Sequence, residues 1–192
     1  RPIMPKIFSV IDSQMKVCFK GQRIETIVRG IRSGIVQDAD EWVESQPIKF
    51  PDIQSSCYIR GKFDTIVRFD DHTYGVIDFK TAEATEDHIG LYSRQLHAYA
   101  YALENSAQGK FSCSPVNTLG LIVYEPKEFS CKSIESVSLN GTLKWLEIPR
   151  NDKAFLEFLH AVLTLLEQPE PPEPSSTCEW CKYRDNSRVT GY

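Results

Sequence analysis

Residues 57–81 contain two strand-like runs joined by a very short polar segment, and this arrangement limits the folds open to the chain. Side chains alternate along a strand, so the first run is expected to have one mainly apolar and one charged face. The apolar face carries Cys57, Phe63, Thr65, Val67 and Phe69, and the charged face carries Arg60, Lys62, Asp64 and Arg68. Asp70-Asp71-His72 then predicts a turn, and residues 72–81 predict a second strand. Because a tight turn makes the two strands antiparallel, it disfavours a purely parallel doubly wound fold.

Other segments have the apolar spacing of amphipathic helices. Residues 87–105 place one apolar stripe on a helix face, formed by Tyr92, Leu96, Tyr99 and Leu103. Residues 152–168 have a similar stripe and begin with Asp152, a suitable N-cap. A weaker helical pattern covers residues 37–45.

Three more strand-like segments follow, at residues 117–124, 133–139 and 143–148. The last two flank Asn140-Gly141, a strong hairpin turn signal. Strands and helices in this order predict an α/β fold of mixed α+β type, in which α-helices flank a central mixed β-sheet. This domain is expected to span residues 1–168, and residues 169–192 are expected to form a proline-rich linker and a cysteine-containing tail.

The acidic residues of the two runs share a face only under one condition. On the second strand Asp78 and Lys80 are two residues apart, so they point the same way, about 7 Å from each other. A three-residue loop at 70–72 would pair Asp64 with Asp78 across the hairpin. A two-residue loop would pair Asp64 with Ile77 instead and separate the carboxylates. A shared site therefore requires the three-residue loop or a bulge.

On one face, Asp64, Asp78 and Lys80 would form a site for hydrolysing a phosphodiester. Two close carboxylates repel each other, and a divalent cation keeps both ionised. Oxygen ligands suit Mg²⁺ or Mn²⁺, which polarises a phosphate and lowers the pKa of a bound water. The lysine could orient that water or offset charge on the phosphate. The simpler interpretation is a cross-strand ion pair between Asp64 and Lys80.

A longer pattern favours the first interpretation. Three motifs occur in order along residues 57–105: Gly61-x-x-Asp64, Val76-Ile77-Asp78-Phe79-Lys80-Thr81 and Gln95-x-x-x-Tyr99. Together they resemble the PD-(D/E)XK nuclease superfamily, which implies a restriction-endonuclease-like fold. The last motif is similar to that of the RecB-like and CRISPR-associated exonuclease branch.

The resemblance assigns a role to each motif residue. It implies that Asp64 and Asp78 bind the metal and that Lys80 assists catalysis. It also implies that Gln95 and Tyr99 lie near the site and help to position substrate or lysine. Their i, i+4 spacing does put them on one helix face, although a surface amide and core packing are the alternatives for these two side chains.

Further metal ligands are less well defined. The backbone carbonyl of Phe79 is a candidate because it lies between Asp78 and Lys80. The family often adds an acidic residue or a histidine on an N-terminal helix. Glu41 and Glu44, three residues apart in the weak helical pattern, are the candidates here, and solvated helix charges are the alternative interpretation.

Cys178-x-x-Cys181 resembles the C-terminal cysteines of the iron–sulfur members of that branch, where one upstream and three C-terminal cysteines bind a [4Fe–4S] cluster. Here Ser187 stands where the last ligand is expected, and nothing fixes Cys18 as the upstream one. Two or three thiolates do not complete a four-ligand site. We therefore expect a structural pair in preference to a [4Fe–4S] cluster or a zinc site.

Composition narrows the partners and the location. The net charge of −4 means that no basic field covers the whole protein, so a nucleic acid would need a local patch. No apolar stretch approaches the ~18 residues of a membrane span, and residues 1–8 do not form a signal peptide. The scattered cysteines favour reduced thiols and an intracellular, cytoplasmic location.

We expect a Mg²⁺- or Mn²⁺-dependent deoxyribonuclease, exonuclease-like, in DNA repair, recombination or defence. DNA is the expected partner, and a helicase or another repair or defence protein is a candidate. The alternative is a domain of the same fold that has lost cleavage and serves as a DNA-binding or assembly module. Hydrolysis of RNA or of a nucleotide is a third hypothesis.

Overall fold

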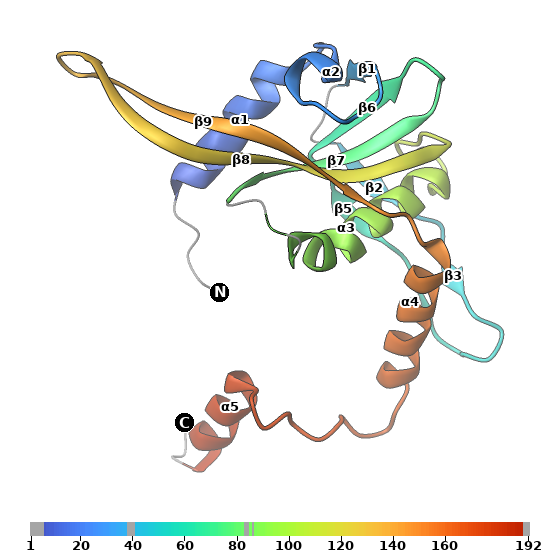
Figure 1. Cartoon of the computed structure of the whole chain (residues 1–192). Helices are drawn as coiled ribbons and strands as arrows, with labels where there is room; N and C mark the ends of the chain where they lie inside the picture. Colours follow the sequence, from blue (N-terminus) through green and yellow to red (C-terminus); the bar gives the residue numbers. More distant parts are fainter. Residues whose placement is uncertain (1–5, 38–40, 83–84, 86, 190–192) are drawn as a thin grey trace.

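The computed structural model describes residues 6–37, 41–82, 85 and 87–189. Its central sheet has five strands in the order β1-β6-β7-β8-β9 (Figure 1). They are β1 (Gly34–Val36), β6 (Thr65–Phe69), β7 (Tyr74–Thr81), β8 (Val116–Ser133) and β9 (Ser136–Ile148). β7 and β8 run parallel, and the other neighbours are antiparallel. The expected mixed sheet is therefore confirmed.

The run expected as a single strand at 57–69 is divided among three strands. Its first two parts belong to two small antiparallel sheets: β2 (Trp42–Glu44) with β5 (Arg60–Lys62), and β3 (Ile48–Lys49) with β4 (Ser56–Cys57). Only β6 belongs to the central sheet. The prediction of a charged face is also wrong for β6, because Ile66 points to the same side as Asp64 and is buried. Both faces of β6 are covered, as expected for an inner strand.

Helices lie on both faces of the sheet (Figure 1). α3 (Asp87–Glu104) links β7 to β8 and supplies the crossover that parallel strands require. Leu96 and Leu103 on α3 pack against one face, which we call the α3 face. α1 (Lys6–Phe19) and the short α2 (Ile24–Ile27) cover the opposite face, the α1 face. Each face therefore has its own hydrophobic core.

The two strong helix predictions are confirmed by α3 and by α4 (Asp152–Leu166). The N-cap of α4 is Asn151 and not Asp152, because the Asn151 side chain accepts a hydrogen bond from the backbone N of Ala154 at 3.0 Å. Asp152 lies in the first turn, where a negative charge favours the helix dipole. A last helix, α5 (Glu179–Val189), follows the proline-rich linker (Figure 1).

The prediction of a helix at residues 37–45 is wrong in the part that the structure describes, because residues 42–44 form β2. Residues 38–40 lie outside the described residues.

The turn expected at Asn140-Gly141 is also wrong. β8 continues to Ser133, the chain turns at residues 134–135, and Asn140-Gly141 lies inside β9. Gly141 serves close packing here, since a Cβ would meet the Tyr124 ring at 2.6 Å. Residues 126–141 form a two-stranded arm, because β7 pairs with β8 only as far as Tyr124. Figure 1 shows this arm projecting from the sheet.

Within the described ranges, none of the helices combines the length and the apolar character needed to cross a membrane.

Candidate active site

The loop between β6 and β7 has three residues, 70–72. It is closed by a hydrogen bond of 2.9 Å from the backbone N of Phe69 to the carbonyl O of Thr73. His72 has a φ of 65°, the left-handed conformation that completes a three-residue hairpin loop. The register observed between β6 and β7 is the one that this loop length predicts. Extended by one residue, it sets Asp64 opposite Asp78.

Asp64 lies just before β6 and is held from two sides. Its Oδ2 accepts a hydrogen bond from the backbone N of Phe79 at 3.0 Å. Its Oδ1 accepts one from Lys16 Nζ on α1 at 2.8 Å. The bond to β7 fixes the carboxylate beside the backbone of Phe79, the residue whose carbonyl is the candidate ligand.

Asp78 is the most buried acidic group of the site, at 3% exposure. Burial, followed by the negative charge of Asp64, raises its pKa to about 7, against the attraction of the Lys80 ammonium. Its Oδ2 forms an ion pair with Lys80 Nζ, and its Oδ1 accepts a hydrogen bond from Gln95 Nε2 at 3.3 Å. Asp64, Asp78 and Lys80 thus come together on the α3 face.

The α3 residues of the third motif reach the same place. Gln95 Nε2 lies 3.3 Å from both Asp78 Oδ1 and the Tyr99 hydroxyl. Burial, more than the nearby Asp78 charge, raises the pKa of Tyr99. The Tyr99 ring packs so closely on β5 that a Cβ at Gly61 would lie 2.7 Å from Tyr99 Cε1. The glycine of the first motif therefore makes room for the tyrosine of the third.

The structure does not bring Glu41 or Glu44 to these residues. Glu41 is exposed. Glu44 lies on β2, where its Oε2 is 3.7 Å from Arg60 Nε and 3.6 Å from Lys110 Nζ. The helix that would have carried both residues is absent from the described part of this segment. Their spacing of three residues therefore does not put them on one helix face.

An acidic residue from the N-terminal helix does approach the site. Lys16 Nζ bridges Asp64 Oδ1 at 2.8 Å and Asp12 Oδ2 at 3.0 Å. Burial lowers the pKa of Lys16, but its hydrogen bonds to Asp64 and Asp12 outweigh that effect and raise it. The i, i+4 pair Asp12-x-x-x-Lys16 could have been noticed in the sequence, although nothing local connects it with Asp64.

The donor set suits a hard divalent cation. Asp64 and Asp78 supply carboxylate oxygens, which are ligands that such cations prefer. The ammonium groups of Lys16 and Lys80 form ion pairs with these carboxylates, so the site already binds positive charge. The raised pKa of Asp78 is what two carboxylates without a metal between them should show. Among the described residues, no group of three or more His, Cys, Asp or Glu side chains is arranged as a metal site.

In the part of the chain that the structure describes, the cysteine pair at the C-terminal end gains no further ligands. The backbone N of Cys181 donates to Cys178 Sγ at 3.5 Å, and this contact lowers the pKa of Cys178. All six cysteines are free thiols. Within the described residues, the thiols do not form a set that would fit a [4Fe–4S] cluster or zinc.

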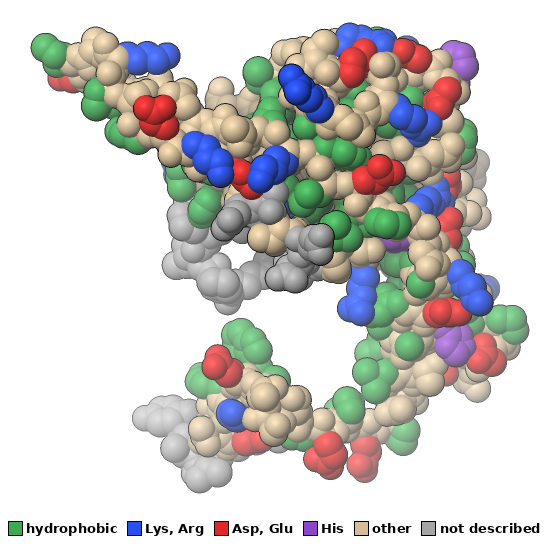
Figure 2. Space-filling model, in the orientation of Figure 1, with side chains coloured by type: hydrophobic (Ala, Val, Ile, Leu, Met, Phe, Trp, Pro, Cys, Tyr) green, Lys and Arg blue, Asp and Glu red, His purple; other side chains and the backbone are tan. Residues whose placement is uncertain are grey.

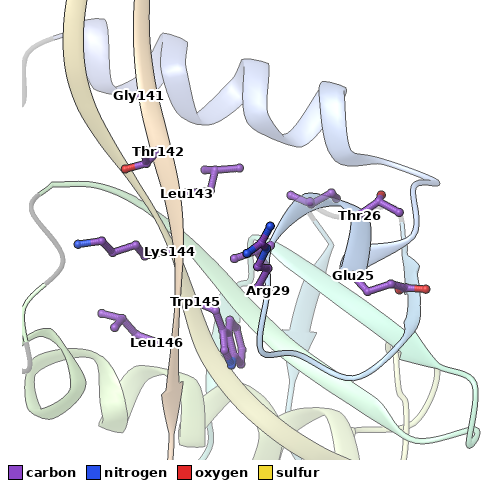
Figure 3. Close-up of a pocket in the computed structure, with 11 residues that line it drawn as sticks. Glu25, Thr26, Arg29, Gly141, Thr142, Leu143, Lys144, Trp145 and Leu146 are labelled. Carbon is purple, nitrogen blue, oxygen red and sulfur yellow. The ribbon is translucent and has the colours of Figure 1, made fainter.

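A separate cavity of about 670 Å³ lies between the α2 segment and β9 (Figure 3). Arg29 and Leu143 are among its lining residues, and so is Trp145, whose ring packs in the core of the α1 face. It is therefore distinct from the cluster of Asp64, Asp78 and Lys80, which lies on the other face.

Comparison with known proteins agrees with this geometry. A family model described as the PD-(D/E)XK nuclease superfamily matches residues 16–186. No curated protein sequence matches the chain. The solved structure described as "Crystal structure of SSO0001" is similar at 15% identity, with a TM-score of 0.47. The match covers 92% of this chain and 66% of that one, and a likeness of this size carries no argument about function.

Proposed function

We propose that this chain, which belongs to the PD-(D/E)XK nuclease superfamily, hydrolyses DNA phosphodiester bonds with Mg²⁺ or Mn²⁺. One observation carries the proposal. Asp64, Asp78 and Lys80 converge on the α3 face, although they come from opposite sides of a hairpin and although the convergence depends on the length of one loop.

Each residue has a role that its contacts support. Asp64 and Asp78, with the carbonyl of Phe79, would hold the metal, which when bound polarises a phosphate and lowers the pKa of a bound water. Lys80 forms an ion pair with Asp78, and this contact supports a role in which it would orient the attacking water or stabilise charge on the phosphate. Gln95 fixes the second oxygen of Asp78.

The finer proposal is an exonuclease-like enzyme of the RecB-like branch, acting in DNA repair, recombination or defence with a helicase or another protein of such a system. The contact of Gln95 with Asp78 and Tyr99 supports the branch. Residues 1–168 would form the nuclease domain and residues 169–192 the linker and tail. Six free thiols support an intracellular location.

A second candidate is a domain of this fold that binds DNA without cutting it. It is favoured by the positions of Glu41 and Glu44, which leave the upstream ligand without a candidate from the sequence, and by the incomplete cysteine set. On the N-terminal helix α1, the acidic residue Asp12 is linked to the site through its ion pair with Lys16.

A substrate panel separates these candidates. End-labelled single-stranded DNA, double-stranded DNA and RNA are incubated with the protein and Mg²⁺ or Mn²⁺, and the product ladder distinguishes exonuclease from endonuclease action. Cleavage of DNA is the expected result. Binding without cleavage under either metal would favour the DNA-binding module, and cleavage of RNA alone would overturn the proposed substrate.

A further inference from the structure

Where β8 leaves the sheet, a buried carboxylate holds two lysines. Glu125 is 2% exposed, and its Oε1 and Oε2 lie 2.9 Å from Lys144 Nζ and 3.0 Å from Lys127 Nζ. The lysine side chains are 51% and 57% exposed. Basic and acidic side chains lie together along the arm toward its base in Figure 2. We call Glu125, Lys127 and Lys144 the Glu125 cluster.

The cluster is not explained by its contribution to stability. A buried ion pair often fails to repay the desolvation of its charges, so hydrophobic residues would serve a core at least as well. One carboxylate meets two ammonium groups here, which leaves the cluster with a net charge of +1. Glu125 fixes both ammonium groups while half of each lysine side chain stays in solvent. The two lysines are therefore held in position and can still meet a second anion.

The cluster lies on the same face of the sheet as the candidate active site. β7 pairs Lys80 with Val123 of β8, and Val123 belongs to the core of the α3 face. Glu125 follows Val123 by two residues and so shares its face. Lys144 pairs with Val123 from β9. Figure 3 shows Lys144 and Trp145 leaving β9 on opposite sides.

The distances are short on the scale of a nucleic acid strand. Neighbouring strands lie about 4.8 Å apart, so the backbone of Lys144, two strands away, is about 10 Å from that of Lys80. The same spacing and a rise of about 7 Å for two residues place Glu125 about 8 Å from Lys80. The lysines thus border the place where the reacting phosphate would lie.

We propose that Lys127 and Lys144, held by Glu125, bind backbone phosphates of the nucleic acid on one side of the phosphate that is hydrolysed. This inference rests on the proposed function. It assigns a phosphate-binding subsite to the base of the arm and gives a protein of negative net charge a local basic surface beside its site.

The test measures the salt dependence of DNA cleavage for Lys127→Gln and Lys144→Gln. Glutamine can still donate a hydrogen bond to Glu125, so the fold is retained while the charge is lost. Each phosphate contact changes the slope of log affinity against log salt by about 0.7 to 0.9. Between 50 and 200 mM NaCl, each variant should therefore lose about threefold less affinity than the wild type. KM at low salt should rise, and kcat should stay unchanged.

Two controls make the result specific. Lys132→Gln removes the same charge from the same arm, outside the cluster, and should keep the wild-type slope and KM. Lys144→Arg keeps the charge and should restore both. If wild type cleaves DNA and the two cluster variants behave like Lys132→Gln, the subsite is wrong and the proposed function stands. If the wild type neither binds nor cleaves nucleic acid, the proposed function and the subsite are both overturned.

Discussion

Asp78→Asn should stabilise the metal-free protein at alkaline pH while abolishing metal-dependent activity. Asparagine has the shape of the protonated aspartic acid and carries no charge. In the folded protein, burial and the Asp64 charge raise the pKa of Asp78 to about 7, whereas an unfolded chain has a value near 3.8. The folded state thus binds the proton more tightly than the unfolded state, so stability falls as pH rises from about 4 through 7.

The size of the effect follows from the two pKa values. At 1.36 kcal/mol per pKa unit, the ionised Asp78 costs on the order of 4 kcal/mol at pH 8 and roughly 1–2 kcal/mol at pH 5. The stability of Asp78→Asn relative to wild type should therefore increase by roughly 2–3 kcal/mol between pH 5 and pH 8. Comparing two pH values cancels any difference in packing between the two side chains.

Urea unfolding in EDTA at both pH values measures this difference, with Asp70→Asn as the control. A hydrogen bond from Arg23 lowers the pKa of the exposed Asp70, so its contribution has the opposite sign and is lost as pH falls. Mg²⁺ at 100 times its Kd should stabilise the wild type by about 2.7 kcal/mol and leave Asp78→Asn unchanged. A relative stability of Asp78→Asn that is the same at pH 5 and pH 8 would refute the reasoning.

Three further predictions concern packing, ion pairs and metal binding. Gly61→Ala should force the Tyr99 ring away from a contact of 2.7 Å and lower the free energy of unfolding in urea by about 1–3 kcal/mol. Adding Tyr99→Leu to this variant should recover the loss. A Gly61→Ala variant as stable as the wild type would contradict the close packing of Tyr99 on Gly61. Arg150→Met should lower the free energy of unfolding by about 3 kcal/mol, because it leaves the largely buried Glu104 without its cationic partner. The control Arg184→Met breaks an exposed ion pair and should change the stability much less. Equal losses in the two variants would disprove the assignment. The affinity for Mg²⁺, measured by calorimetry, should weaken about tenfold for each pH unit below 7. Asp78 must be ionised to bind the metal, so binding should also release a proton. An affinity that does not change between pH 5 and pH 7 would argue against Asp78 as a ligand.

The parts of the site that the sequence predicts best depend on local geometry. Strand alternation made the relation of Asp64 to Asp78 depend on the loop length, and the three-residue loop of the structure selects the register that sets them opposite each other. Helical periodicity alone put Gln95 and Tyr99 on one face of α3, and the hydrogen bond between them agrees. Such inferences need no knowledge of how distant segments pack.

The parts that the sequence does not predict depend on tertiary packing. Division of residues 57–69 among three strands is set by β2 and β3, which pair with β5 and β4 from elsewhere in the chain. The approach of Lys16 to Asp64 requires α1 to dock on the sheet. Asn140-Gly141 has a strong local turn preference, but the pairing of β8 with β9 overrides it and uses the glycine for close contact with Tyr124.

The most direct test of the central claim is the rate of DNA cleavage by wild type and by three single variants, Asp64→Asn, Asp78→Asn and Lys80→Gln, in Mg²⁺. If these residues form one catalytic site, each variant should lose cleavage by at least about 10²-fold while remaining folded. Cleavage by the wild type that survives in all three variants would contradict the account, because the phosphodiester would then be hydrolysed somewhere else.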